Sequence, residues 1–441
     1  MTTLKVHFVH VGNMNNKGTQ ALFKSDFNTI KEITNKETFV SVSTTDIEGV
    51  KRLNLPMNAV LPPMVDIPYD KADQLIRKFG VTREDIRYKV YVLALLGYMF
   101  LQIPLTLLSI FFMKLGLKAF YRSSVLKCIK NCDLVISHSD ENFKETASLL
   151  PLNPSWVITW WSMLISRTCE VLVARSFGKP VVMFPNSVGP FRTKMGELLV
   201  KLSLNLCDRV LIRDSISYKI VTQLGIRALK TLTYDTALLF SSEKENLEHG
   251  FTRPLLGVCP GIYSNSLSGK QVDNYIMAHA GALDAVIDKY GLQVVFIPHY
   301  ISGFSGDDLD VSKQILQKMR NQKFAKIVNI SAVDEFKAYL DQMDMIISSK
   351  MHPAVLGVSG FVPLLCILYD HKQTSFFDRL GMIDCTLSLH AVSEKNLFDK
   401  IVYVWSKRDQ LRESLKKQIP IWQKHVYTAI AKTVEATSKQ S

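Results

Sequence analysis

Several patterns that would place this chain in a common functional class are missing from its 441 residues. Lys and Arg are spread along the chain without a run of five or more, so we expect no nucleic-acid partner. The 7 cysteines form no C-x-x-C motif and no paired Cys/His spacing, so we expect no metal site. Residues 1–5 lead directly into strand-like sequence, which predicts a cytoplasmic protein without a secretory signal peptide.

The composition is that of a globular protein with an excess of positive charge. Hydrophobic residues make up 47% of the chain and charged residues 21%, which excludes intrinsic disorder as its class. The formal net charge of +13 suits an anionic small substrate or an anionic membrane face. The length is comfortable for two domains.

One apolar segment interrupts this soluble pattern. Residues 90–113 contain no charged side chain, and about 20 apolar residues are enough to cross a bilayer as a helix. Pro104 near the middle would kink such a helix, and a single crossing would separate residues 1–89 from the rest of the chain. A helix buried in the core is the alternative. We expect an element that docks on the membrane and keeps Lys89 and Lys114 at the headgroups.

Short apolar strands alternate with helices along most of the chain, and this alternation predicts an α/β fold. We expect two Rossmann-like domains with parallel sheets, facing one another across a cleft. The first spans residues 1–240 and carries the apolar helical insertion, and a polar linker follows at 241–250. The second spans residues 251–393, and residues 394–441 form helices that pack back.

Loops at the carboxyl ends of parallel strands converge on the ligand-binding edge of a sheet. Asn16 and Gly18 follow the first strand, where glycine permits close backbone approach and the next helix offers N–H groups to an anion. An ordinary turn is the alternative. Asp140 lies in a polar segment after residues 133–137, where an exposed helix start would look similar. Arg213 follows an apolar strand directly, so its charge needs a partner, either Asp214 or an anionic ligand.

The second half of the chain places further polar residues after its strands. His299 and Tyr300 follow one strand, and Lys350 and His352 follow another. A lone histidine in such a position is more often structural. Four basic side chains in equivalent positions, with Arg213 as the fourth, predict an anion-binding cleft.

The order of these motifs resembles the polysaccharide pyruvyl transferase family. The resemblance covers roughly residues 10–380 and rests on V-x-I-R-D-S-x-S at 210–217, I-P-H-Y at 297–300, S-S-K-M-H at 348–352 and P-L-L-C-I-L-Y-D-H-K at 363–372. It implies a GT-B-like pair of domains. It also implies transfer of a pyruvyl group from phosphoenolpyruvate to two sugar hydroxyls as a cyclic ketal, with release of phosphate and without a cofactor.

The resemblance assigns roles to individual residues. Arg213 matches the family's arginine and His352 its histidine, whereas Lys350 occupies a position that the family usually fills with arginine. Arg213 and Lys350 would hold the anionic groups of phosphoenolpyruvate, and His352 would protonate its methylene carbon as general acid. His299 or Asp140 would serve as base.

Two departures from the family pattern bear on the substrates. Lys350 keeps the positive charge but lacks the planar fork that grips a carboxylate or phosphate bidentately. Residues 138–142, H-S-D-E-N, replace a loop that is rich in glycine in the family. The first departure affects donor binding, and the second leaves the acceptor open.

The acceptor that fits the apolar segment is a cell-surface glycan or a lipid-linked sugar, handled by a cytoplasmic enzyme at the inner face of the cell membrane. Two other functions are compatible with the same pattern, because a fold does not fix a function. One is a nucleotide-sugar-dependent GT-B glycosyltransferase. The other is a non-catalytic, membrane-docked protein that binds glycans.

Overall fold

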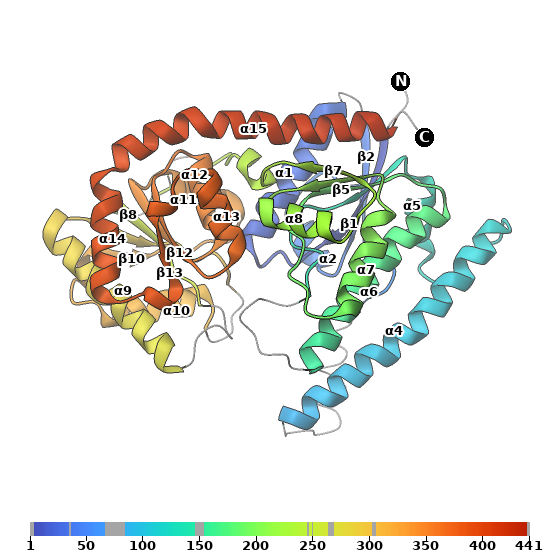
Figure 1. The fold of residues 1–441 in the computed structure, drawn as a ribbon, viewed down its shortest axis with the longest axis horizontal. Coiled ribbons are helices and arrows are strands. Elements are labelled where there is room, and N and C mark those ends of the chain that lie inside the picture. The colour runs from blue at the N-terminus through green and yellow to red at the C-terminus, as the bar shows by residue number, and fades with distance from the viewer. Residues whose placement is uncertain are drawn as a thin grey trace. The chain divides into compact units, whose positions relative to one another are not determined.

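The computed structural model describes residues 4–34, 37–66, 84–145, 154–244, 247–248, 250–262, 269–301 and 306–438. The chain forms two compact units (Figure 1). Unit 1 consists of Met1–Asn13, Asp26–Thr233 and Thr428–Ser441, and unit 2 consists of Met14–Ser25 and Tyr234–Tyr427. Each unit contains one parallel sheet, which confirms the α/β fold that the alternating pattern predicts.

The sheet of unit 1 has 7 strands in the order β3-β2-β1-β4-β5-β6-β7. Neighbouring strands pair in parallel throughout. Its central strands read as continuous apolar runs because helices cover both faces, as parallel sheets require. In chain order the strands are β1 (Leu4–Val11), β2 (Thr38–Thr44), β3 (Ala59–Leu61), β4 (Leu134–Ser137), β5 (Val181–Asn186), β6 (Arg209–Ile212) and β7 (Leu229–Leu232).

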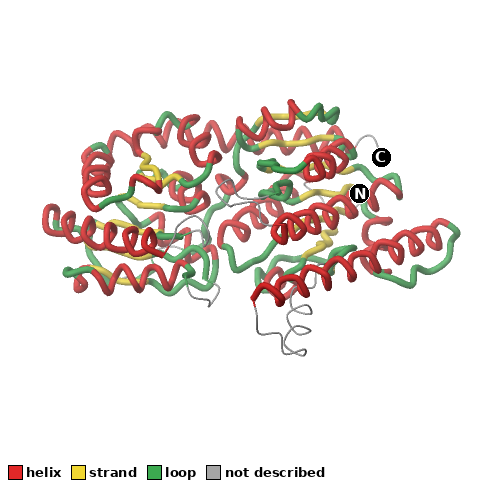
Figure 2. Tube along the Cα trace, turned by 60° about the horizontal axis from the view of Figure 1, so that its bottom comes forward, coloured by secondary structure: helices red, strands yellow, loops and turns green. Residues whose placement is uncertain are grey.

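Helices connect these strands and lie on the faces of the sheet (Figure 2). Several begin at side chains that cap free backbone N–H groups: Asp46 caps α2, Thr193 caps α7 and Asp214 caps α8. Among the described residues, the helices that belong wholly to unit 1 are α2 (Ile47–Lys51), α4 (Glu84–Lys114), α5 (Ser123–Asn131), α6 (Pro154–Ser176), α7 (Lys194–Asn205) and α8 (Ser215–Gln223). Helix α1 (Lys17–Thr34) starts in unit 2 and ends in unit 1.

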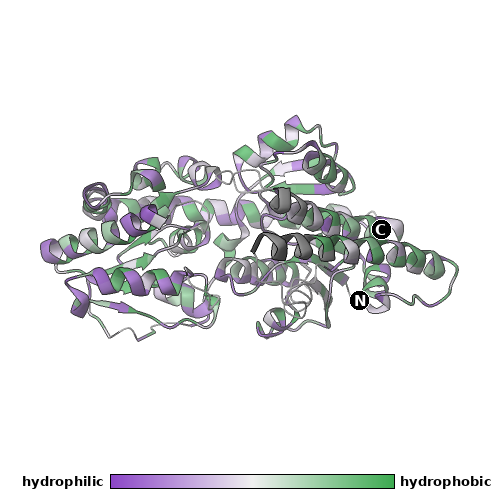
Figure 3. Cartoon of the chain, turned by 90° about the horizontal axis from the view of Figure 1, so that it is seen from below, coloured by the Kyte–Doolittle hydropathy of each residue, from purple (hydrophilic) through white to green (hydrophobic). Residues whose placement is uncertain are grey.

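The apolar segment at 90–113 forms most of α4, a helix of 31 residues with Pro104 inside it. Hydrophobic residues follow one another along this helix (Figure 3). Helix α4 packs along α6, but a large part of its side chains stays exposed. It is therefore an outer helix of unit 1, in contrast to the buried core helix considered above.

The sheet of unit 2 has 6 strands in the order β10-β9-β8-β11-β12-β13, again all parallel. Strands β8 and β11 lie in the middle and are fully buried. In chain order the strands are β8 (Leu255–Cys259), β9 (Gln293–Phe296), β10 (Ala325–Ile327), β11 (Met345–Ser348), β12 (Leu364–Leu368) and β13 (Thr386–Ser388).

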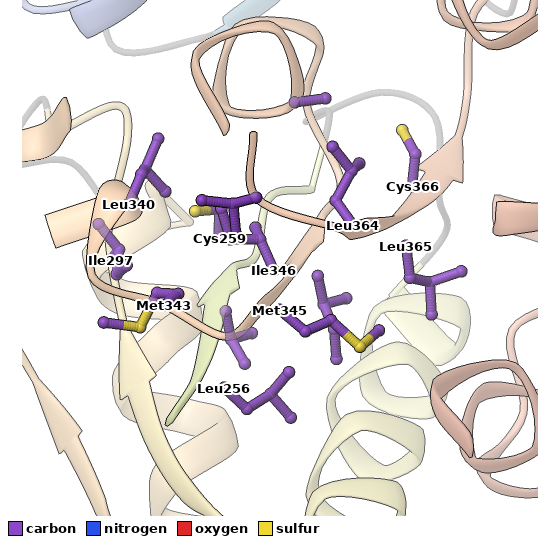
Figure 4. Close-up of a cluster of buried hydrophobic side chains, with 14 of the residues drawn as sticks. Leu256, Cys259, Ile297, Leu340, Met343, Met345, Ile346, Leu364, Leu365 and Cys366 are labelled. Atoms are coloured by element: carbon purple, nitrogen blue, oxygen red, sulfur yellow. The ribbon is translucent and has the colours of Figure 1, made fainter. Parts of the chain in front are cut away.

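The core of unit 2 forms where the central strands meet the helices above and below them (Figure 4). Leu256, Ile346 and Leu364 from three neighbouring strands are completely buried there, as is Leu340 of α11. The helices are α9 (Gly269–Tyr290), α10 (Asp308–Lys318), α11 (Val333–Asp341), α12 (Met351–Ser359), α13 (His371–Arg379) and α14 (Glu394–Ser406). Helix α15 (Arg408–Ser438) starts in unit 2 and ends in unit 1.

Each strand order contains one point at which the direction of winding reverses, and open α/β sheets bind ligands at the carboxyl end of that point. In unit 1 the reversal lies between β1 and β4, and in unit 2 it lies between β8 and β11. The loops after β1, β4 and β11 carry Asn16, Gly18, Asp140, Lys350 and His352, whereas Arg213 follows β6 and His299 and Tyr300 follow β9.

Candidate functional site

Lys350 and His352 lie at the winding reversal of unit 2, where β11 passes into α12. Lys350 is the N-cap residue of α12, and His352 lies in the first turn of that helix. His352 is 7% exposed, so its imidazole is largely removed from water. The chain therefore passes from a buried strand into a helix as predicted, and this places a cation and an imidazole at the carboxyl edge of the sheet.

Lys350 is held by an acidic partner at the start of α10. Its Nζ donates a 2.6 Å hydrogen bond to Oδ1 of Asp308, and Nζ lies 5.4 Å from the centre of the Tyr300 ring. Oδ2 of Asp308 accepts a 2.8 Å bond from the backbone N–H of Tyr300. Burial raises the pKa of Asp308, and the positive charge of Lys350 opposes that shift. Asp308 thus fixes where the ammonium group of Lys350 lies.

The room for the Lys350 side chain depends on a glycine across the reversal. Gly261 follows β8, and a Cβ added to it would lie 2.5 Å from Cε of Lys350. Any side chain at position 261 would displace the stem of the lysine, since real Cβ contacts never approach so closely. Gly261 after β8 therefore leaves room for the side chain of Lys350, which carries the positive charge after β11.

His299, after β9, has one ring nitrogen engaged by the backbone. Its Nε2 accepts a 2.9 Å hydrogen bond from the N–H of Gly18, which fixes the proton of a neutral ring on Nδ1. Nδ1 is buried and has no hydrogen-bond partner among the described residues. Burial lowers the pKa of His299 well below its usual range, and Lys350, His352 and Lys17 lower it further. His299 is therefore a neutral ring whose remaining N–H donor lies near Lys350 and Lys17.

Gly18 also makes room for the imidazole of His352. A Cβ at position 18 would lie 2.2 Å from Nδ1 of His352 and 2.7 Å from its Cβ. Asn16 supports the same turn, because its Oδ1 accepts a 2.8 Å bond from the N–H of Gly18 and its backbone bridges to Tyr300. The N–H of Gly18 thus serves His299 and Asn16, and anion binding by the N–H groups of the following helix stays a prediction.

Two lysines that sequence reasoning left out of the site are buried at this edge of unit 2. Lys17 is 5% exposed and lies close enough to His299 to lower its pKa. Lys372, at the start of α13 after β12, is also 5% exposed, and its Nζ lies 3.5 Å from Oδ2 of Asp370. Both follow apolar strands, so the rule that singled out Lys350 also applies to them. Lys17 and Lys350 thus bring positive charge close to His299, whereas Lys372 is paired with Asp370.

Arg213 lies at the carboxyl edge of the unit 1 sheet, after β6. Its Nε donates a 2.8 Å hydrogen bond to Oγ of Ser187, and its Nη2 lies 3.7 Å from Oε1 of Glu141. Asp214 instead caps α8, where its Oδ1 accepts a 2.7 Å bond from the N–H of Ser217. Of the two partners considered for Arg213, Asp214 is therefore committed to the helix start. Whether Arg213 and His352 bind one molecule stays a prediction.

Asp140 follows β4 in the polar loop, and its backbone carbonyl accepts a 3.0 Å bond from the N–H of Ser187. Beside it lies a buried pair that the sequence did not reveal: Nδ1 of His138 donates a 2.8 Å bond to Oδ2 of Asp26. Ser139 donates to the same carboxylate from both its N–H and its hydroxyl, each at 2.9 Å. The sequence pattern that could have predicted this pair is Asp26 itself, a carboxylate next to Phe27 on the apolar face of α1.

Within the described ranges, no group of three or more His, Cys, Asp or Glu side chains is arranged to hold a metal ion. The sequence-based site residues divide between the two units. Unit 2 brings together Asn16, Gly18, His299, Tyr300, Lys350 and His352, and unit 1 carries Asp140 and Arg213. Apart from Asp308, which pairs with Lys350, the side chains of unit 2 named here offer positive charge and hydrogen-bond donors, which suits an oxygen-rich anion.

Residues 52–371 match the polysaccharide pyruvyl transferase family. The chain belongs to this family. It is also 21% identical over 260 residues to the amylovoran biosynthesis protein AmsJ of Erwinia amylovora. That match covers 55% of this chain and 61% of AmsJ, less than two thirds of the length of AmsJ.

Solved structures that resemble the chain share its fold at low sequence identity. UDP-GlcNAc 2-epimerase of Neisseria meningitidis, bound to UDP-GlcNAc, gives a TM-score of 0.56 at 10% identity, covering 98% of this chain and 100% of that one. The epimerase of Methanocaldococcus jannaschii gives 0.54 at 12%, covering 92% and 93%. A glycotransferase of kitacinnamycin gives 0.53 at 12%, covering 99% and 100%. These matches show the two-domain α/β fold of the family member and leave its substrates open.

Proposed function

We propose that this protein transfers the pyruvyl group of phosphoenolpyruvate to two hydroxyls of a sugar in polysaccharide biosynthesis, forming a cyclic ketal. The observation that supports this most is the set of basic and donor side chains at the winding reversal of unit 2, in a chain of this family. Phosphoenolpyruvate carries a carboxylate and a phosphate, and both need cations and donors. Lys17 and Lys350 supply charge, and Nδ1 of His299 offers a buried N–H to a substrate oxygen.

His352 acts as the general acid in this proposal. It gives a proton to the methylene carbon, so that the central carbon becomes electrophilic and is attacked by the first sugar hydroxyl. The bond from the central carbon to the phosphate oxygen then breaks, and the second hydroxyl closes the ring. One of the two hydroxyl protons makes good the proton that His352 gave to the methyl group, and the other leaves with phosphate.

In this proposal His299 does not receive the hydroxyl proton, and the role of Asp140, which lies in unit 1, stays a prediction. Sequence reasoning left His299 and Asp140 open for the role. His299 is already engaged, because its Nε2 lone pair accepts the bond from Gly18 and its Nδ1 carries the proton. A ring without a free lone pair takes no proton. We propose a glycan or lipid-linked sugar as acceptor, and a reaction without a cofactor.

The test is the release of inorganic phosphate from phosphoenolpyruvate in the presence of lipid-linked glycan extracts. We expect the wild-type protein to release phosphate, and His352→Asn to reduce the rate by at least about a hundredfold through loss of the general acid. The exposed His390 supplies the matched control, and His390→Asn should react at the wild-type rate. Binding of UDP-GlcNAc without any phosphate release would instead support a nucleotide-sugar-dependent enzyme.

A further inference from the structure

Helix α4 exposes large apolar side chains and buries several polar ones. Its exposed side is a continuous row of large hydrophobic residues, among which Phe100 is 72% exposed, Leu107 62% and Phe111 57%. Helices of soluble proteins place their apolar face inward and their polar face in water. We name this row the apolar stripe; it consists of Leu93, Phe100, Leu101, Leu107, Leu108 and Phe111 of α4 and of Leu115 directly after the helix.

Three polar residues of α4 lie on the opposite side and are buried against unit 1, together with the apolar Met99, Ile110 and Met113. Gln102, Thr106 and Ser109 are each less than 5% exposed. Gln102 donates a 2.8 Å bond to the carbonyl of Asp66 and accepts a 2.9 Å bond from its N–H. Ser109 accepts a 3.1 Å bond from the N–H of Tyr121. These bonds set the rotation of α4 about its axis, so that the apolar stripe is held outward.

The exposed apolar surface continues beyond the end of the helix. Leu117 and Phe120 follow in the next turn and are more than half exposed. Soluble monomers rarely expose contiguous apolar patches of this extent unless the patch contacts a partner or a membrane. Exposing this apolar surface to water costs free energy, so we expect an apolar partner or a membrane to cover it.

The charged residues around α4 indicate that a membrane covers this surface. Residues 86–132 contain no Asp or Glu, but they contain seven cations: Arg87, Lys89, Lys114, Lys118, Arg122, Lys127 and Lys130. Lys114 and Lys118, next to the end of the stripe, are exposed. Basic residues that border an apolar helical face are typical of helices that bind anionic phospholipids, because the headgroups neutralise the lysines while the acyl chains take up the apolar side chains.

Within the described part of the chain, one helix, Leu96–Lys114, is long and apolar enough to cross a membrane by length and composition. The sheet of unit 1 argues against a crossing. Strand β1 precedes α4 and β4 follows it, and the two pair directly. A single crossing would place these paired strands on opposite sides of the bilayer. A helix that lies in the plane of the interface leaves the sheet intact.

We propose that α4 docks the protein on an anionic phospholipid surface, with its axis in the plane of the membrane and its apolar stripe among the upper acyl chains. The buried polar side of α4 stays on unit 1, and Lys114 and Lys118 lie at the headgroups. The inference stands independently of the proposed pyruvyl transfer, since it uses none of the site residues. It accounts for a helix that exposes a row of large apolar side chains while it buries Gln102, Thr106 and Ser109.

The test is flotation of the full-length protein with vesicles. One set consists of phosphatidylcholine alone, and the other contains phosphatidylcholine and phosphatidylglycerol in equal amounts. We expect the wild type to float with the phosphatidylglycerol vesicles, less at high salt and less on neutral vesicles, because anionic headgroups attract the lysines. Failure of the wild type to bind phosphatidylglycerol vesicles at low salt would overturn the proposal.

Two variants test the residues themselves. Phe100→Gln, Leu107→Gln and Phe111→Gln combined should weaken vesicle binding at least about tenfold, because affinity scales with buried apolar area. Lys114→Glu with Lys118→Glu should remove the preference for phosphatidylglycerol. The matched control carries three exposed apolar residues elsewhere, Leu229→Gln, Met277→Gln and Ile421→Gln, and should bind as the wild type does. Equal binding of the α4 triple variant and the control would contradict the assignment of the stripe.

Two further measurements distinguish lipid docking from a spanning helix and from an interface with a second copy of the chain. Alkaline carbonate should release the protein from vesicles, and resistance to carbonate would show a spanning helix instead. Light scattering without vesicles should give the same mass for the wild type and the α4 triple variant. A wild-type dimer that the triple variant converts to a monomer would assign the stripe to a second copy of the chain and overturn lipid docking.

Discussion

The backbone N–H of Gly18 donates a 2.9 Å hydrogen bond to Nε2 of His299, across 281 positions of sequence. This bond joins the first turn of α1 to the loop after β9 and settles which nitrogen of His299 carries the proton. The same glycine leaves the space that the ring of His352 occupies. One backbone position therefore controls the orientation of two imidazoles in unit 2.

Replacing Gly18 by alanine should disturb both imidazoles. The added methyl group would overlap the ring and Cβ of His352, and a buried ring has little room to give way. We expect Gly18→Ala to lower kcat for phosphate release from phosphoenolpyruvate at least about tenfold, with a smaller change in KM, because the acid is misplaced while the cations remain.

The control for this variant is Gly269→Ala at the start of α9, where an added Cβ meets nothing within 4 Å. Its kcat and KM should equal those of the wild type. A Gly18→Ala enzyme with wild-type kcat would show that the position of the His352 ring does not limit the reaction.

The pairing of Lys350 with Asp308 predicts separate effects on stability and on donor binding. Lys350→Met leaves a buried carboxylate without its cation, which should lower the free energy of unfolding by about 3 kcal/mol. Adding Asp308→Asn removes that unpaired charge and should restore most of the stability. Affinity for phosphoenolpyruvate should stay roughly tenfold to a hundredfold weaker in the double variant, since the donated charge is still missing.

Urea unfolding measures the stabilities, and calorimetric titration with phosphoenolpyruvate measures the affinities. Lys350→Arg is informative beside them, because Gly261 leaves space for a slim ammonium stem only. We expect it to bind the donor more weakly than the wild type, although arginine is usual at this position in the family. Tighter binding by Lys350→Arg would show that the lysine is merely a tolerated replacement.

The sequence-based prediction that Arg213 and His352 act on one molecule is tested by a double-mutant cycle. Arg213→Lys keeps the charge but loses the Nε bond to Ser187, and His352→Asn removes the imidazole. If both bind phosphoenolpyruvate, the losses of binding free energy should fall short of additivity by more than about 0.5 kcal/mol. Additive losses would place the two residues on different ligands.

Buried neutral histidines predict loss of stability in acid. Burial lowers the pKa of His7 and His10 to about 3 and that of His279 to about 4. As the pH falls below the ordinary histidine value of about 6.5, the unfolded chain takes up protons that the folded chain refuses. Each such histidine should therefore cost up to about 1.4 kcal/mol per pH unit between pH 6.5 and its own pKa.

The thermal unfolding midpoint, measured from pH 7 to pH 5, checks this dependence. His279 donates to the carbonyl of Tyr275, and His279→Gln keeps a donor without a group that titrates. We expect its midpoint to fall less steeply with acid than that of the wild type. His390→Gln, which changes an exposed histidine, should leave the slope unchanged. Identical slopes for all three proteins would exclude His279 as a contributor.

The sequence by itself determined the features that depend on short stretches of chain. Apolar runs of strand length, each followed by a helix, are sufficient for parallel sheets, because consecutive βα units wind in one hand. A residue directly after a strand must lie at the carboxyl edge of its sheet. For that reason Arg213, His299, Lys350 and His352 could be placed at the carboxyl edges of the two sheets without coordinates.

Only the tertiary structure decided which of these groups meet and which way they face. The pairing of Asp26 with His138 depends on how α1 packs beside β4, and 112 positions of sequence separate the two residues. The outward turn of the α4 stripe depends on bonds from Gln102 and Ser109 to distant loops. Periodicity specifies that a helix has two faces, but the face that is buried is set by long-range packing and hydrogen bonding, which a local pattern does not contain.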